Sequence, residues 1–546
     1  MENPLITDLQ TPNAPAVFDA DICIIGGGAA GISLALDLQG HGLGVCLLEG
    51  GGLTEDTESH ALYEGKAVGH PMEPADGRYR GLGGSTSRWT GCSAPLSSID
   101  FEERPWVHSS GWPITREELS PYYRQAWDFC AVRDVMRPDE AVLADLGEDR
   151  LALDPKALDP FIWRYPSRTD FPRKYFSWAF AGPLRTSQDV QVLLHANICG
   201  FEAEGDGASI TAVAVKTLTG VTARVRARAF VLSCGGLENA RILLNSASTV
   251  PGGLGNAHDL VGRYFMQHLR GDSGTVEATP EQAAVLQNSF NYFPARNGTR
   301  YEVGFSLPEQ VQRDEKLLNA SAVLAYEPSE HSSWIATKTI LQDLRSRVPT
   351  LATARAARNL ARHPREAVVS SWRRLQGRPA HLLSSVIRVN QDLEQMPNPD
   401  SRVTLTDEVD ALGLRRLRVD WRVDPIEVAT ARRLTEAVGA ELKRLGLGTV
   451  HIDPSLLSGG MPPETMLRTH HHIGTTRMAA DPRHGVVDAD CRVHGTDNLF
   501  VAGSSVFPTG GHANPTLTIV ALAVRLGEHL RQSLAKPQAA TVRQVA

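Results

Sequence analysis

The chain has 546 residues and a formal net charge of −7, with 42% hydrophobic and 21% charged residues. This composition is typical of a globular protein with material for two or three domains, and it does not favour nucleic acid as a partner. No run of about 20 apolar residues occurs, which argues against a membrane-spanning helix.

The seven cysteines include no CxxC pair, so a disulfide framework, a zinc ribbon or an iron–sulfur cluster is not expected. The first residues lack the basic and long apolar segments of a secretory signal. We therefore expect a cytoplasmic protein. Residues 1–18 and 536–546 are expected to be loose tails.

The first structured segment, FDADICIIGGGAAGISLALDLQGHGLGVCLLEGG, predicts a strand, a glycine-rich turn, a helix and a second strand. Residues 21–25 form an apolar run typical of a buried parallel strand, residues 29–39 resemble a helix, and residues 44–48 resemble the next strand. This order of elements is the context that a dinucleotide-binding site requires.

Three glycines of this segment follow the G-x-G-x-x-G spacing, which allows a tight turn, close approach of a pyrophosphate and close packing of helix on strand. The positive end of the helix then faces the phosphates, and an acid at the end of the second strand can bind a ribose hydroxyl. The candidate cofactor contacts here are Gly26, Gly28, Ala29, Ala30, Gly31 and Glu49.

A second glycine-rich block, RYRGLGGSTSRWTGCSAPL, covers residues 78–96. Gly83, Gly84 and Ser85 are candidate contacts because small residues let backbone N–H groups approach a large ligand. A loop that binds nothing is the alternative, since such a block is a weak signal by itself.

Two later segments repeat the pattern of apolar strand, glycine turn and helix. One is ARAFVLSCGGLENARILLNS, residues 227–246, and the other is NLFVAGSSVFPTGGHANPTLTIVALAVRLGEHL, residues 498–530. In the second, the strand ends at Gly503, which is a further candidate cofactor contact. Asn514 and Pro515 are suited to open a helix as cap and first residue. The parallel sheet is thus predicted to be assembled from both ends of the chain.

The middle of the chain predicts a second unit. Residues 269–330 and 385–425 contain alternating strand-like runs, such as SRVTLTD and LRRLRVDWRVD, that suggest a second sheet. The expected fold is α/β, with a Rossmann-like dinucleotide-binding domain made of discontinuous segments and an α+β substrate-binding domain with an antiparallel sheet. The predicted boundaries are 19–110, 186–268 and 484–535 for the first domain, and 111–185 and 269–483 for the second.

Residues 338–378 hold ten basic residues against Asp343 and Glu366, and much of this stretch has a helical pattern. A solvated helical face is the simplest interpretation. A docking surface, an active-site lid or a peripheral membrane contact are the alternatives, and Trp334, Leu341, Leu344 and Trp372 are the possible apolar anchors.

Six blocks of the chain resemble the glucose–methanol–choline (GMC) family of flavoprotein oxidoreductases, and most closely its pyranose oxidase-like branch. They are DADICIIGGGAAG, RGLGGSTSRWTG, SCGGLENARILL, LVGRYFMQH, HHIGTTRM and NLFVAGSSVFPTGGHANPTLTIVALAVR, in the order of the family. The resemblance implies FAD, a two-domain fold and oxidation of the CH–OH group of an alcohol, in particular a sugar or glycoside.

The resemblance also implies site residues. The catalytic base of the family matches His471 in HHIGTTRM, and its His or Asn partner matches Asn514. A histidine is suited to accept the hydroxyl proton because its pKa lies near neutrality. In the family a helix N-terminus points at the flavin pyrimidine, and the matching contacts are Ala513, Asn514 and Thr516.

Three neighbouring histidines, His470 to His472, also raise the possibility of a metal site. We expect none, because alternate side chains of a strand point to opposite faces and cannot converge on one ion. His470 and His472 are then supporting residues. His512, two residues before Asn514, is the main rival of His471 for the role of base.

Arg88 departs from the pyranose oxidase pattern, which has at this position a histidine that is covalently joined to the flavin. We therefore expect non-covalent FAD. Arg88 can instead face a phosphate or substrate hydroxyls, or pair with a carboxylate.

The sequence leaves oxygen, a quinone or a carrier protein open as electron acceptor. A flavin-binding protein without alcohol oxidation and an NAD-dependent dehydrogenase are the alternative functions. The glycine turns are spread over the chain, which disfavours the NAD enzyme.

Overall fold

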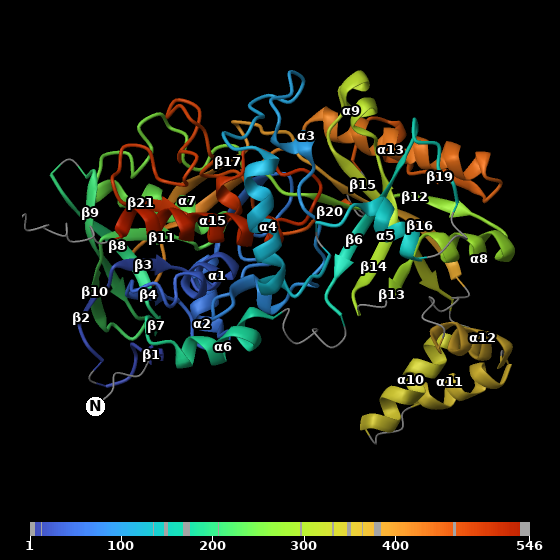
Figure 1. The fold of residues 1–546 in the computed structure, drawn as a ribbon, viewed down its shortest axis with the longest axis horizontal. Coiled ribbons are helices and arrows are strands. Elements are labelled where there is room, and N and C mark those ends of the chain that lie inside the picture. Colours follow the sequence, from blue (N-terminus) through green and yellow to red (C-terminus); the bar gives the residue numbers. More distant parts are fainter. Residues whose placement is uncertain are drawn as a thin grey trace, which may run out of the picture.

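A computed structural model describes residues 6–12, 14–134, 136–146, 151–167, 175–205, 207–294, 298–329, 332–346, 351–362, 364–375, 384–461 and 466–535. Within them, two halves lie side by side, one built on a parallel sheet and the other on an antiparallel sheet (Figure 1). The predicted fold class is therefore confirmed. No helix of these residues is long and apolar enough to cross a membrane.

The parallel sheet gathers strands from both ends of the chain, as the repeated strand–turn–helix segments predict. Its strands, in spatial order, are β1 (Ile6–Asp8), β7 (Val190–Leu194), β4 (Val45–Leu48), β3 (Ile22–Ile25), β11 (Ala229–Leu232) and β21 (Leu499–Val501). Every residue of β3, β4, β11 and β21 is buried, because helices or other layers cover both faces of a parallel sheet.

Four helices pack around this sheet: α1 (Ala29–Asp37), α4 (Arg116–Cys130), α6 (Phe176–Thr186) and α15 (Thr516–Leu534). Apolar side chains of α4 and α6, such as Leu119, Tyr123 and Phe176, belong to the core of the parallel half. The assignment of residues 111–185 to the substrate domain is thus wrong for these two helices. Among the described residues of that stretch, β6 (Asp159–Tyr165) pairs with the antiparallel sheet.

The antiparallel sheet forms the other half and confirms the second sheet predicted for the middle of the chain. Its main path is β13 (Tyr292–Pro294), β14 (Arg300–Ser306), β15 (Ala320–Pro328), β16 (Ser384–Leu393), β12 (Leu269–Glu277) and β19 (Thr449–Ile452), with β6 beside β14 and β20 (Met466–Arg468) beside β12. Helix α13 (Pro425–Arg444) packs on this sheet through buried residues such as Leu434 and Val438.

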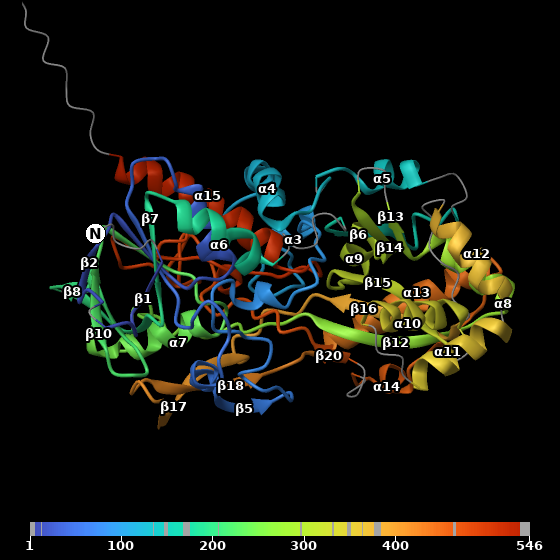
Figure 2. The same cartoon turned by 90° about the horizontal axis from the view of Figure 1, so that it is seen from below.

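Two smaller sheets correct the sequence-based assignment. β17 (Arg402–Val409) and β18 (Arg415–Trp421) do not join the large antiparallel sheet; they pair with β5 (Gly65–Gly69) on a separate side of the molecule (Figure 2). The expectation of a loose tail is wrong for residues 6–12 and 14–18, because β1 extends the parallel sheet and β2 (Val17–Asp19) pairs with β10 (Thr222–Arg226). The sheet of β2 and β10 continues through β9 (Ser209–Lys216) to β8 (Asn197–Glu204).

The remaining α-helices are short connectors, apart from three helices that form a separate bundle. The connectors are α2 (Thr57–His60), α3 (Ser98–Phe101), α5 (Asp139–Leu146), α7 (Glu238–Asn245), α8 (Pro280–Ser289), α9 (Glu309–Glu315) and α14 (Pro454–Leu457). Short 3-10 helices cover Ala61–Tyr63, Gly84–Ser87, Ser246–Ser248 and Ser504–Val506.

The basic stretch forms the helical bundle of α10 (Ser333–Ser346), α11 (Leu351–Arg362) and α12 (Pro364–Leu375), which protrudes from the antiparallel half (Figure 1). Its helical pattern is confirmed. Arg347 and Arg378 lie outside the described residues, as do residues 536–546.

Candidate active site

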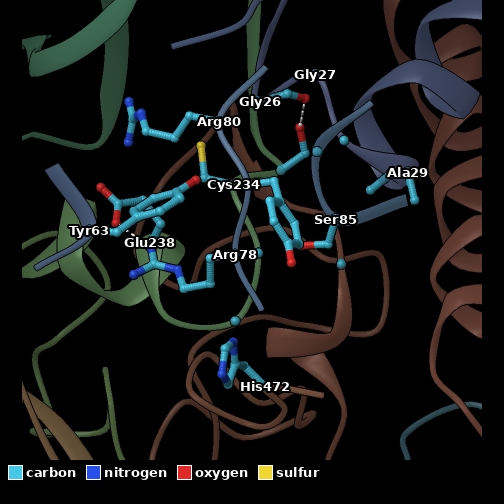
Figure 3. Close-up of a pocket in the computed structure, with 18 of the residues that line it drawn as sticks. Gly26, Gly27, Ala29, Tyr63, Arg78, Arg80, Ser85, Cys234, Glu238 and His472 are labelled. Carbon is cyan, nitrogen blue, oxygen red and sulfur yellow. Dashed lines mark hydrogen bonds and ion pairs between the residues drawn. The ribbon is translucent and has the colours of Figure 1, made fainter. Parts of the chain in front are cut away.

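A cavity of about 420 Å³ lies where the two halves meet, at the carboxyl ends of the parallel strands. Gly26 follows β3, Glu49 follows β4, Ser233 follows β11 and Gly503 lies just beyond β21, and all four line the cavity. This edge of an open α/β sheet is where ligands bind. Figure 3 shows how the glycine turn around Gly26 and Gly27 faces side chains from distant segments.

The glycine turn has the backbone geometry that the G-x-G-x-x-G spacing predicts. Gly26 has φ +116°, and a Cβ there would lie 2.5 Å from the carbonyl oxygen of Ser233. A Cβ on Gly31 would lie 1.9 Å from the oxygen of Gly26, whereas a Cβ on Gly28 would meet nothing within 4 Å. Gly26 and Gly31 therefore permit the turn and the packing, and Gly28 leaves its side of the cavity open to a ligand.

The carboxylate of Glu49 holds three glycine loops together. Its Oε2 accepts a hydrogen bond from the backbone N–H of Gly27 at 3.0 Å, and its Oε1 accepts from Gly51 at 2.8 Å and from Gly81 at 3.0 Å. Each oxygen has more than one acceptor direction, so a ribose hydroxyl can still bind. Contact of Glu49 with a ribose stays a prediction.

Most, but not all, of the other predicted cofactor contacts line the cavity. Those that line it are Ala29, Ala30, Gly84, Ser85, Gly503, Asn514 and Thr516. Gly31, Gly83 and Ala513 lie behind the wall: Gly83 donates its N–H to the carbonyl of Gly27 at 2.7 Å, and Ala513 is buried. These three support the cavity through packing and loop geometry.

A buried charged network lines one side of the cavity, and sequence reasoning missed it. Arg78 donates to Glu238 at 2.7 Å, Arg241 donates to the other oxygen of Glu238 at 2.9 Å, and Arg241 also pairs with Asp410 at 2.5 Å. Burial raises the pKa of Glu238, but the guanidinium groups of Arg241 and Arg78 outweigh it and lower that pKa to about 2.

The ring of Tyr63 lies 3.6 Å from the guanidinium carbon of Arg78 and belongs to the same side of the cavity (Figure 3). Arg78 and Glu238 stand in two glycine-rich blocks that sequence reasoning had singled out. The sequence therefore shows both charged residues. It does not show that they pair, because they lie 160 residues apart in the chain.

The far end of the cavity is lined by the histidine segment, where His471 forms a pair with His268. Their Nδ1 atoms lie 2.9 Å apart, and Nε2 of His268 lies 3.3 Å from the carbonyl oxygen of Gly510. Burial, followed by the neighbouring His268 and Arg270, lowers the pKa of His471 well below its ordinary value. His471 is therefore neutral at physiological pH, as a proton acceptor must be.

Asn514 lies at the same end of the cavity but not as a helix cap. Helix α15 begins at Thr516 with Pro515 at the capping position, one residue later than predicted. The Asn514 side chain is instead held from two sides, since Oδ1 accepts from Nη2 of Arg270 and Nδ2 donates to the carbonyl of Cys92, each at 2.9 Å. One N–H of its amide remains available to a substrate oxygen.

His512 is removed from the cavity. It is 3% exposed, its Nδ1 lies 3.0 Å from Oδ1 of Asn319, and its ring packs edge-on against Phe161 and Trp163. This position favours His471 over His512 as the base.

His470 and His472 also line the cavity, so the argument from strand alternation is wrong. Residues 469–472 follow β20 and are not in a strand, and His470 has φ +60°. Among the described residues, no group of three or more His, Cys, Asp or Glu side chains is arranged to hold a metal ion.

Arg88 pairs with a carboxylate, one of the two roles considered for it. Its Nη2 lies 3.0 Å from Oε2 of Glu55, and the side chain is 62% exposed at the cavity rim. An arginine here cannot form the covalent link of a histidine.

The residues of the cavity fit FAD. The N-terminus of α1 opens into the cavity without an acidic residue in its first turn, which suits a pyrophosphate, and the N-terminus of α15 does the same near His471. The space runs continuously from the glycine turn to the histidines, as a dinucleotide with a flavin at its far end requires.

Comparison with known proteins agrees with this fit. Residues 21–369 match the family model of FAD dependent oxidoreductases, and residues 397–523 match that of GMC oxidoreductases. The chain is 27% identical to 6'''-hydroxyparomomycin C oxidase of Streptomyces lividus, over 96% of this chain and 93% of that protein. It is 25% identical to paromamine 6'-oxidase of Streptomyces fradiae, over 92% and 90% of the two chains.

The fold is shared with solved structures. Pyridoxine 4-oxidase from Mesorbium loti superposes with a TM-score of 0.55 at 18% identity, covering 93% of this chain and 98% of that one. A formate oxidase superposes with a TM-score of 0.57 at 15% identity, covering 95% and 99%. The chain is therefore an FAD-dependent oxidoreductase and belongs to the GMC oxidoreductase family.

Proposed function

We propose that the protein oxidises a CH–OH group of a sugar or glycoside to a carbonyl. The observation that carries this proposal is the neutral His471 in the cavity wall, beside Asn514 and at the end opposite the glycine turn. The names of the relatives point to the substrate class. Besides 6'''-hydroxyparomomycin C oxidase and paromamine 6'-oxidase, a C-glycoside 3-oxidase of Microbacterium trichothecenolyticum is 36% identical over 137 residues, 24% of this chain and 25% of that protein.

The chain supplies the proton acceptor and the groups that orient the alcohol. His471 takes the hydroxyl proton, because burial keeps its imidazole neutral. Asn514 donates to the substrate oxygen as negative charge develops on it. Arg270, which is fixed to Asn514 and to Asp392, adds positive charge beside that oxygen. When bound, FAD supplies the acceptor for the hydride that leaves the substrate carbon.

The test is anaerobic addition of candidate sugars and glycosides to the yellow protein while its visible spectrum is recorded. Loss of the yellow colour with any of them, and a carbonyl product in the same amount, supports the proposal. A flavoprotein whose colour persists with the whole panel would be a flavin-binding protein without alcohol oxidation. Mixing the bleached protein with oxygen or with a quinone then identifies the electron acceptor.

A further inference from the structure

We propose that His268 is a positioning residue that sets the tautomer of His471, so that Nε2 of His471 is the atom that accepts the substrate proton. This inference rests on the proposed function for its catalytic meaning, but the tautomer itself can be measured without substrate. His268 lies immediately before β12 and reaches across to the segment after β20.

The hydrogen bonds fix the protons in one order. A carbonyl oxygen cannot donate, so the contact of 3.3 Å between Nε2 of His268 and Gly510 requires the proton on that Nε2. A neutral imidazole carries only one proton, so Nδ1 of His268 is an acceptor. The Nδ1 of His471, 2.9 Å away, must therefore carry the donated proton. Its Nε2 is left with a free lone pair.

The surroundings keep both rings neutral. His268 is 1% exposed, and burial lowers its pKa as it lowers that of His471. The charged and titratable groups around the pair are Arg270, Asp392, His470, His472 and His512. Arg270 and the neighbouring histidines oppose a positive charge on the pair, while Asp392 offsets part of that effect for His268. At neutral pH each of the two rings therefore carries one proton, in the order given above.

Nε2 of His471 is available to accept a proton from a substrate. Among the described residues no hydrogen bond reaches Nε2 of His471, and the ring lines the cavity. Once Nε2 holds the substrate proton, the Nδ1–H of the resulting imidazolium still donates to His268. The acceptor on His268 therefore selects the reactive tautomer and still orients the ring after the proton transfer.

Two variants separate this role from mere packing. His268→Leu fills much of the space but removes the acceptor, whereas His268→Asp keeps an acceptor that cannot donate when ionised. Both should retain FAD, which absorbance and thermal unfolding check. In ¹⁵N spectra of histidine-labelled holoprotein, the His471 signal is assigned as the one that disappears in His471→Ala. In the wild type this signal should show a protonated Nδ1 and an unprotonated Nε2. We expect it to lose that pattern in His268→Leu and to keep it in His268→Asp.

The pH profile of anaerobic flavin bleaching gives the second readout. The wild-type rate should rise with pH and reach half of its plateau below pH 6.5, because the pKa of His471 is lowered. His268→Leu should lower the plateau at least about tenfold, within the range of general-base effects. His268→Asp should recover part of the rate and move the midpoint upward.

A wild-type His471 with its proton on Nε2 would overturn the inference, and so would a His268→Leu variant with the wild-type plateau. Failure of the proposed function has a different signature, since no sugar or glycoside would then bleach the wild-type flavin. The ¹⁵N spectra decide the role of His268 in that case too.

A separate observation carries a second inference: we infer that the helical bundle of α10, α11 and α12 docks on an anionic lipid surface. Fifteen large apolar side chains are exposed among the described residues, and the three helices of 14, 12 and 12 residues hold seven of them. These seven are Ile335, Leu341, Leu344, Leu351, Val368, Val369 and Trp372.

Basic side chains stand among these apolar ones. On α11, Leu351, Arg355, Arg358 and Arg362 recur at helical spacing and are all exposed. A surface that combines exposed Leu and Trp with Arg matches a negatively charged membrane interface, where apolar anchors enter the headgroup region and each cation contributes roughly 1 kcal/mol. The bundle protrudes from the body, so it can meet a flat surface without the body interfering (Figure 1).

Flotation with phosphatidylcholine vesicles, with and without phosphatidylserine, tests the docking of the holoprotein. We expect flotation only with the anionic vesicles, its loss at high salt, and its loss in the double variant Leu344→Glu, Trp372→Glu. Leu457→Glu, an exposed residue on α14, is the matched control and should float like the wild type. Absence of flotation at low salt, or flotation that the double variant leaves unchanged, would overturn the inference. Capture of an acidic protein without vesicle binding would also overturn it.

Discussion

Nη2 of Arg270 donates a hydrogen bond to Oδ1 of Asn514 at 2.9 Å. This bond joins β12 of the antiparallel half to the segment that opens α15 in the parallel half, at the wall of the cavity. It also fixes the orientation of the Asn514 amide, because Oδ1 faces the guanidinium and Nδ2 must face the carbonyl of Cys92.

Asn514→Asp keeps an acceptor for Arg270 but removes both N–H donors of the amide. We expect FAD to be retained and anaerobic bleaching to slow by about 10²-fold, the usual cost of losing a donor to a developing oxyanion. Asn256→Asp makes the same change outside the cavity and should leave the rate nearly unchanged. A near wild-type rate for Asn514→Asp would show that its amide does not bind the reacting oxygen.

FAD is expected to be bound without a covalent link, because Arg88 stands where the related pyranose oxidase pattern has the linking histidine and pairs here with Glu55. Precipitation of the yellow protein with acid should leave the flavin in the supernatant. Yellow colour that stays in the washed pellet would contradict this expectation.

Gly31→Ala should abolish FAD binding or prevent folding of the glycine turn, because the added Cβ would lie 1.9 Å from the oxygen of Gly26. Gly182→Ala is the matched control, since a Cβ there meets nothing within 4 Å. The ratio of flavin to protein absorbance after purification measures the effect. A Gly31→Ala protein with a full complement of FAD would show that α1 can move away from β3 without loss of the site.

His512 should make the protein sensitive to acid. Burial lowers its pKa to about 3 in the folded chain, whereas an unfolded histidine titrates near about 6.5. Below pH 6.5 the unfolded chain therefore binds a proton that the folded chain does not, and the free energy of unfolding falls by up to about 1.4 kcal/mol per pH unit. Above pH 6.5 the histidine is neutral in both the folded and the unfolded chain, so His512 does not lower the free energy of unfolding there.

Urea unfolding at pH 7.5 and pH 5 measures how much the free energy of unfolding falls as the pH is lowered. His512→Gln should lose less stability between the two values than the wild type, while His484→Gln, at an exposed histidine, should behave like the wild type. An equal loss in His512→Gln and wild type would mean that His512 is not buried in its neutral form.

The parallel half could be predicted from the sequence because its signals are local. Residues 21–25, the glycine turn and residues 44–48 are close in the chain, and the spacing of Gly26 and Gly31 reports the packing that the structure shows. The resemblance to a known family pointed to His471 and Asn514, both of which line the cavity.

What could not be predicted depends on pairing between distant segments. Alternation in β18 predicts a strand but does not identify the strand with which it pairs. Its partner β5 lies some 350 residues earlier in the chain, and Arg416 of β18 contacts Glu64 across that separation. For the same reason the sequence concealed the bond between His268 and His471, which are 203 residues apart. Helices α4 and α6 were misplaced because an amphipathic helix does not specify which sheet it covers.

The central claim is that His471 accepts the substrate proton, and the anaerobic bleaching rate of His471→Ala tests it most directly. The variant should keep FAD and lose at least about two decades of rate, or about 3 kcal/mol of barrier, as expected for a positioned general base. Substitution of His470, His472 or His512 should cost much less. A His471→Ala protein that bleaches at nearly the wild-type rate, while His512→Ala is inactive, would contradict the account and place the base at His512.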